Sequence, residues 1–246
     1  MSGLLVTGTD TGVGKTFVTA GIARALKDDG LDVGVMKPAE TDHDHGPWPA
    51  DAQTLATAAR VTDPAEIVVP YVFGPPVAPL VAARMANRAI EVERIFDAFE
   101  RIAARHDTVL VEGAGGLAVP LAEFGERDRL FDYADLARRL DLSILIVARA
   151  HLGTLNHTAL TIEYARQRGV PVVGVVVNGL DHALEDASAP DNPALIEEMG
   201  GVPVLGVIER VEGIVDVERM AAAVRESVDL DRLRNLLTST DDGGPA

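Results

Sequence analysis

The chain has 246 residues, of which 47% are hydrophobic, enough for one large or two small domains with a packed core. It contains no cysteine, so disulfides, thiolate nucleophiles and cysteine zinc sites are excluded. The formal net charge of −16 argues against general binding to nucleic acid or anionic membranes, because both depend on basic patches.

The first strong pattern is a short apolar strand at residues 4–6 that runs into a glycine-bearing loop ending in Gly14, Lys15 and Thr16. Such a loop directs backbone N–H groups and a helix N-terminus toward an anion. Its lysine can reach the β- and γ-phosphates, and its hydroxyl can coordinate Mg²⁺. Five residues rather than four separate Gly8 from Gly14, so the loop is a variant form. The pattern predicts nucleotide binding.

A helix over residues 15–29 follows, with apolar residues at three- to four-residue spacing and Gly30 as its stop. Residues 32–36 form the next strand, which ends at Lys37 before Pro38. A strand, helix, strand unit implies a parallel sheet, and functional groups in such sheets gather at the carboxyl ends of strands. Lys37 lies at such an end, although a single lysine there is more often a surface residue.

Residues 40–50 form a polar loop in which His43 and His45 alternate with Asp42 and Asp44, before a helix that starts with Asp51. A metal site is conceivable from these residue types. We favour a solvated loop, because residues two apart in a loop need further partners to complete a coordination sphere.

A second amphipathic helix over residues 91–105 precedes a buried strand at 108–111, which runs into Glu112 and glycines at 113, 115 and 116. An acid at the end of a parallel strand, followed by glycines, suits a Mg²⁺-nucleotide site. The same stretch fits the dinucleotide pattern G-x-G-x-x-A. That pattern must open a helix, and Val119 and Pro120 argue against one here.

Further strands are expected at residues 143–147, 172–177 and 204–208, with Asn178 at the end of the second. Residues 148–155 are expected to form a loop into a helix that ends near residue 168, and two shorter helices close the chain. We predict one catalytic domain over residues 1–237 and a disordered acidic tail over 238–246. No apolar run approaches the roughly 20 residues of a membrane span, and no signal peptide is evident, so we expect a cytoplasmic protein.

Six motifs in order, GTDTGVGKT, VMKP, the Asp51 helix, VEGAGG, HLGTLNH and VVVN, resemble those of the dethiobiotin synthetases over roughly residues 3–208. The resemblance implies an α/β fold: a three-layer P-loop NTPase with a mainly parallel central sheet and helices on both faces. It also implies a homodimer with its active site at the interface. Such enzymes are ATP-dependent cyclo-ligases of biotin biosynthesis. They join CO₂ to 7,8-diaminononanoate as a carbamate, phosphorylate the carbamate with ATP, and close the ring of dethiobiotin.

The resemblance also implies a role for each matching residue. Lys15 and Lys37 would hold the carbamate and the γ-phosphate, with Thr11 beside them as part of the catalytic group. The nucleotide would be bound by Gly12, Val13, Gly14, Lys15, Thr16 and Phe17, with Asn178 reading the adenine. Mg²⁺ would be bound by Thr16, Asp51 and Glu112. The diamine would be bound by Thr41 and, through its carboxylate across the dimer interface, by Gly153, Thr154, Leu155 and Asn156.

Two alternatives remain open. A cobyrinic acid synthase-type ligase carries an additional glutaminase domain, for which this chain has neither the length nor the cysteine. A ParA/MinD-type ATPase switch usually has a second lysine early in its phosphate loop, where this chain has Thr9, Asp10 and Thr11.

The chain also departs from the synthetase pattern itself, because Glu209 follows Ile208 where that family usually has proline.

Overall fold

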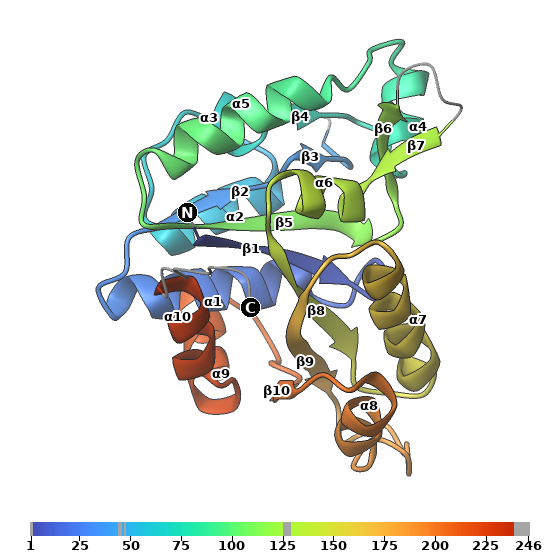
Figure 1. The fold of residues 1–246 in the computed structure, drawn as a ribbon. Coiled ribbons are helices and arrows are strands. Elements are labelled where there is room, and N and C mark those ends of the chain that lie inside the picture. Colours follow the sequence, from blue (N-terminus) through green and yellow to red (C-terminus); the bar gives the residue numbers. More distant parts are fainter. Residues whose placement is uncertain (1, 44–45, 47, 125–128, 239–246) are drawn as a thin grey trace, which may run out of the picture.

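The centre of the molecule is a six-stranded sheet in which every strand pair is parallel (Figure 1). This sheet belongs to a computed structural model that describes residues 2–43, 46, 48–124 and 129–238. The strand order is β10-β9-β8-β1-β5-β2. The strands are β1 (Ser2–Gly8), β2 (Val33–Met36), β5 (Thr108–Gly116), β8 (Ser143–Arg149), β9 (Val172–Leu180) and β10 (Val204–Glu209). The predicted parallel sheet is confirmed.

Helices cover both faces of the sheet, so each strand buries side chains on two sides. Leu4 and Val6 of β1 pack into one core and Leu5, which points the other way, into the other. The first core includes residues from α1 (Lys15–Asp28), α2 (Ala50–Ala59), α9 (Val217–Ser227) and α10 (Leu230–Thr238). The second includes residues from α4 (Pro79–Met85), α5 (Val92–Ala103), α6 (Tyr133–Arg139), α7 (Thr154–Gln167) and α8 (Asn192–Gly200).

Short elements follow the ends of β2 and β5 along the chain. Strand β3 (Ala39–Glu40) pairs in parallel with β4 (Tyr71–Val72), and α3 (Ala65–Val68) lies between them in sequence. Strand β6 (Pro120–Phe124) pairs antiparallel with β7 (Arg129–Asp132). The sequence did not predict these elements or α4, α6 and α8, because segments this short carry little periodicity.

Two predicted boundaries were wrong. The strand at residues 108–111 was expected to end at Glu112, but β5 continues through Gly116, which lies opposite Gly8 of β1 in the sheet. Glu112 therefore lies within the strand, because pairing with β1 extends it through the glycines. Thr154 and Leu155 were expected in the loop before a helix, and they form the first turn of α7. Rejection of the dinucleotide pattern is confirmed, because β6 rather than a helix begins at Pro120.

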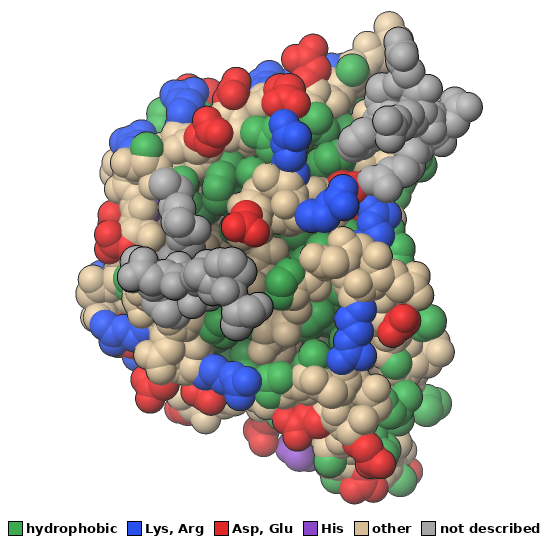
Figure 2. All heavy atoms as spheres, in the orientation of Figure 1, with side chains coloured by type: hydrophobic (Ala, Val, Ile, Leu, Met, Phe, Trp, Pro, Cys, Tyr) green, Lys and Arg blue, Asp and Glu red, His purple; other side chains and the backbone are tan. Residues whose placement is uncertain are grey.

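Acidic and basic side chains are interspersed on the face of the molecule drawn in Figure 2 rather than separated by sign. Among the described residues, no helix has the length and apolar character needed to cross a membrane. The proposed single domain stays a prediction, and residues 239–246 of the expected tail lie outside the described residues.

The packing of α5 on the sheet gives a direct test of the fold. Ile102 is fully buried, and its side chain lies so close to Gly34 of β2 that a Cβ there would be 2.5 Å from it. Ile102→Ala should lower the free energy of unfolding by about 2–5 kcal/mol, because the cavity refills only in part. Urea denaturation measures this change. The exposed neighbour Glu100→Ala should change it by less than about 0.5 kcal/mol, and equal effects of the two variants would contradict the packing.

Candidate active site

The loop between β1 and α1 is held by the neighbouring strands β8 and β9. Thr9 N donates to Val147 O at 3.0 Å, and the Asn178 side-chain amide donates to Val13 O at 2.9 Å. Gly14, the residue before α1, has φ +87°, and a Cβ on it would lie 2.1 Å from Asn178 Nδ2. Glycine is therefore required at this position both for the left-handed backbone and for the close approach of Asn178.

Lys15 lies at the start of α1 with its ammonium group near the loop. Its Nζ donates to Asp10 O at 3.0 Å, and the residue is buried. Burial lowers the pKa of Lys15 below its ordinary value, although attraction to Glu112 partly opposes this. The next residue, Thr16, donates its hydroxyl hydrogen to Glu112 Oε1 at 2.9 Å. The phosphate loop is thus joined directly to the middle of β5.

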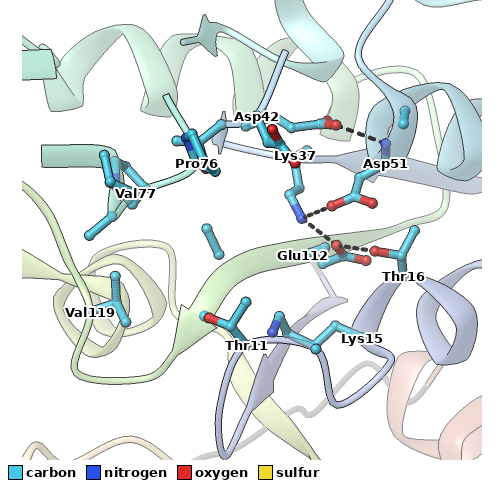
Figure 3. Close-up of a pocket in the computed structure, with 18 of the residues that line it drawn as sticks. Thr11, Lys15, Thr16, Lys37, Asp42, Asp51, Pro76, Val77, Glu112 and Val119 are labelled. Atoms are coloured by element: carbon cyan, nitrogen blue, oxygen red, sulfur yellow. Dashed lines mark hydrogen bonds and ion pairs between the residues drawn. The ribbon is translucent and has the colours of Figure 1, made fainter. Parts of the chain in front are cut away.

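Lys37 lies between two carboxylates rather than on the surface (Figure 3). Its Nζ donates to Asp51 Oδ2 at 2.7 Å and also to Glu112 Oε1. Burial alone would lower the pKa of Lys37, but the charges of Glu112 and Asp51 outweigh burial and raise it. For Asp51, burial favours a higher pKa, and the charge of Lys37 reverses this to give a lowered one. Lys37 and Asp51 are therefore both charged at neutral pH.

Glu40 is a site residue that the sequence did not reveal. Its buried carboxylate accepts hydrogen bonds from the backbone N–H groups of Asp51 at 2.8 Å and Ala52 at 2.9 Å. It thereby caps the N-terminus of α2 from a distance of eleven residues along the chain. Burial raises the pKa of Glu40. No local pattern could show this cap, because it depends on how the chain folds back after β3.

A cavity of about 590 Å³ brings most of the predicted site residues together. Figure 3 shows Thr11, Lys15 and Thr16 on one side of it, with Lys37, Asp51 and Glu112 meeting beside them. The predicted residues that line it are Thr11, Gly12, Gly14, Lys15, Thr16, Lys37, Thr41, Asp51 and Glu112. Lining residues not predicted for the site are Glu40, Asp42, Ala50, Pro76, Val77, Ala78, Pro79, Ala114, Gly115 and Val119.

Seven predicted site residues do not line this cavity within the described part of one chain. They are Val13, Phe17, Asn178, Gly153, Thr154, Leu155 and Asn156. Val13 is buried within the loop, and Phe17, in the first turn of α1, packs against the hydrophobic core. Leu155 and Asn156 line a separate depression together with Arg166. A role for residues 153–156 at this cavity would require a second subunit.

The oxygen atoms around Glu112 of β5 suit a hard divalent cation. Glu112 Oε2 is buried and has no hydrogen-bond partner among the described residues. With the Asp51 carboxylate and the Thr16 hydroxyl it gives an oxygen-only donor set, which Mg²⁺ prefers. In the polar loop, His43 Nε2 instead contacts Gly46 O at 3.0 Å, and no group of three or more acidic or histidine side chains in the described residues could hold a metal. Asp44 and His45 lie outside the described residues.

Known proteins with similar sequences identify the family. Residues 2–218 match a family model described as "AAA domain". An ATP-dependent dethiobiotin synthetase from Anaeromyxobacter sp. (strain Fw109-5) is 46% identical over 219 residues, 89% of this chain and 95% of that protein. This chain belongs to the dethiobiotin synthetase family. The family member from Bacillus licheniformis is 39% identical over 237 residues, 96% of this chain and 97% of that protein. The chain is therefore an enzyme of the ATP-dependent ligase class.

Solved structures confirm the predicted P-loop NTPase fold of this dethiobiotin synthetase family member. The MinC:MinD cell division protein complex of Aquifex aeolicus gives a TM-score of 0.56 at 15% identity, covering 100% of this chain and 99% of that one. A ParA family ATPase from Chlorobium tepidum TLS gives 0.52 at 17% identity, covering 94% and 92%. At such low identity the likeness shows the fold alone, so it does not favour a switch protein over a ligase.

The buried position of Lys37 generates a prediction for catalysis. Lys37→Ala should reduce ATP turnover by about 100-fold or more, because it removes a fixed positive charge from a site that must stabilise anions. ATP binding should survive, since the loop amides and Lys15 remain. Steady-state assays and calorimetric titration with ATP measure the two effects.

Two further variants complete this experiment. Lys37→Gln keeps a donor for Glu112 and separates loss of charge from loss of folding, which thermal melting monitors. Lys27→Ala, at the far end of α1 where the lysine pairs with Asp32, should leave turnover unchanged. Normal turnover in both Lys37 variants would remove this residue from the active site.

Proposed function

We propose that the chain joins CO₂ to 7,8-diaminononanoate at the expense of ATP and closes the ring of dethiobiotin, a step of biotin biosynthesis. The observation that carries this proposal is that Lys15, Lys37 and the phosphate loop line one cavity. The lining of this cavity of about 590 Å³ also includes Thr41 and residues 76–79, beyond the phosphate loop, where a second reactant would bind. The names of the relatives, all dethiobiotin synthetases, support the same substrates.

The chemistry has three steps, and each uses groups supplied by the substrates. An unprotonated amine attacks CO₂ and forms a carbamate after losing a proton. A carbamate oxygen attacks the γ-phosphorus of ATP, which breaks the bond to ADP and gives a carbamic-phosphoric anhydride. The second amine then attacks the carbonyl carbon, and phosphate leaves with that oxygen as the ring closes. No covalent nucleophile from the protein is required.

The protein's part is to bring two anions together. A carbamate and a triphosphate repel each other, so their approach requires fixed positive charge. Lys15 and Lys37 both line the cavity and would supply it, and Thr11 of the phosphate loop belongs to the same lining. The excess of acidic residues in the chain, with its net charge of −16, makes this local concentration of positive charge more important.

Mg²⁺ would be held by Thr16, Asp51 and Glu112, whose oxygen atoms form a fitting donor set. When bound, the ion neutralises charge on the phosphate oxygens. Glu40 fixes the backbone of Asp51 and so positions this ligand. Lys37, which holds both carboxylates in this structure, would remain close to the transferred phosphoryl group.

The remaining assignments follow the family's pattern. Residues 12–17 would cradle the nucleotide phosphates, and Asn178, fixed beside Val13, would read the adenine. Thr41 would line the diamine pocket. Residues 153–156 of a second subunit would bind the substrate carboxylate, because they do not line the cavity of their own chain. This arrangement requires a homodimer. A cytoplasmic location and the absence of nucleic-acid or membrane partners stay predictions.

Mass spectrometry of the complete reaction tests the proposal. With ATP, Mg²⁺, bicarbonate and 7,8-diaminononanoate, the protein should form dethiobiotin, and ATP consumption should depend on the diamine. Omission of either bicarbonate or the diamine is the control and should abolish the product. ATP turnover that ignores the diamine but rises with DNA or lipid vesicles would overturn the proposal in favour of an ATPase switch.

A further inference from the structure

Asp42 is a cavity residue whose role the site described above does not explain. Four carboxylates line the cavity, and three of them are already engaged. Glu40 accepts two backbone hydrogen bonds, and Asp51 and Glu112 share Lys37. The Asp42 carboxylate is exposed and has no hydrogen-bond or ion-pair partner among the described residues. It is thus the acid in this lining that is free to meet a ligand.

The backbone holds Asp42 firmly in an unusual conformation. Its φ of +68° lies in the left-handed region, which glycine adopts more readily than a residue with a side chain. Phe73 fixes the chain on both sides of it, because Phe73 N donates to Glu40 O at 3.0 Å and His43 N donates to Phe73 O at 3.2 Å. The carboxylate is therefore presented at the cavity by a segment tied to β4.

The cavity that Asp42 lines is polarised. Lys15 and Lys37 share one region of it with Asp51 and Glu112, which both pair with Lys37, whereas Asp42 adds a negative charge elsewhere in the lining. Residues 76–79, Pro-Val-Ala-Pro, add an apolar stretch. In Figure 3, Asp42 and Pro76 lie at the top of the view, and Thr11 and Lys15 lie at the bottom. A ligand that combines a cationic group with an aliphatic chain matches this distribution.

We propose that Asp42 binds the ammonium group of the singly protonated diamine and thereby directs the neutral amine toward the phosphate loop. This inference rests on the proposed function. Two amines on adjacent carbons disfavour double protonation, because the like charges repel, so the diamine reaches the enzyme largely with one of its two amines protonated. The ammonium is attracted by Asp42, whereas Asp51 and Glu112 are already paired with Lys37 and Lys15 repels it. Only the unprotonated amine can attack CO₂, so Asp42 is a specificity-determining residue.

The variant Asp42→Asn tests this role, because it keeps the shape of the side chain and removes its charge. The KM for 7,8-diaminononanoate should rise by about 10- to 100-fold, the usual effect of losing a hydrogen bond to a charged group. The KM for ATP should change by less than about twofold, since ATP does not contact Asp42 in this proposal. Glu66→Gln removes one exposed acid outside the cavity and is the matched control, with both constants unchanged.

A second variant, Asp42→Gly, separates binding from folding. Glycine accepts the left-handed backbone, so its melting temperature should equal or exceed that of the wild type. Its KM for the diamine should nevertheless rise as in Asp42→Asn. An unchanged diamine KM in both variants, or an equal rise in the KM for ATP, overturns the role of Asp42 and leaves the proposed function intact. Wild-type protein that ignores the diamine overturns both.

Discussion

The contact on which the site depends is the buried Lys37 ammonium between the carboxylates of Asp51 and Glu112. It joins the end of β2, the start of α2 and the middle of β5. Removal of one partner from a buried ion pair leaves an uncompensated charge, which costs about 3–5 kcal/mol. Thr16 donates a hydrogen bond to the same Glu112, so this contact also helps to position the phosphate loop.

In the proposed function, this arrangement lets a strongly acidic chain hold two anionic reactants. Lys37 pairs with Asp51 and Glu112, and Lys15, the loop amides and the α1 N-terminus add positive potential at the phosphate loop. The protein would then act by position and charge, without a nucleophile of its own. The chain belongs to the dethiobiotin synthetase family, and the substrates proposed on that ground suit such a site.

The sequence predicted those parts of the site that depend on local pattern. The pattern of a strand, a glycine loop and a helix predicted Lys15 and Thr16 for the site. The expected ends of two strands predicted Lys37 and Glu112. Glu40 and Asp42 were not predicted for the site, because a long-range cap and a strained backbone arise only when the chain folds back along β4. Glu112 was predicted at the end of its strand, and pairing of β5 with β1 instead continues the strand through Gly116.

The measurement that tests the central claim most directly is the fate of oxygen from CO₂. If a carbamate oxygen attacks ATP in this cavity, ¹⁸O-labelled CO₂ should place a single labelled oxygen in the inorganic phosphate, because that oxygen leaves with the phosphoryl group. The reaction must be sampled before CO₂ exchanges its label with water. In a parallel reaction with unlabelled CO₂ and ¹⁸O-labelled water, phosphate that takes its new oxygen from the water would show direct hydrolysis of ATP. That result would contradict the account.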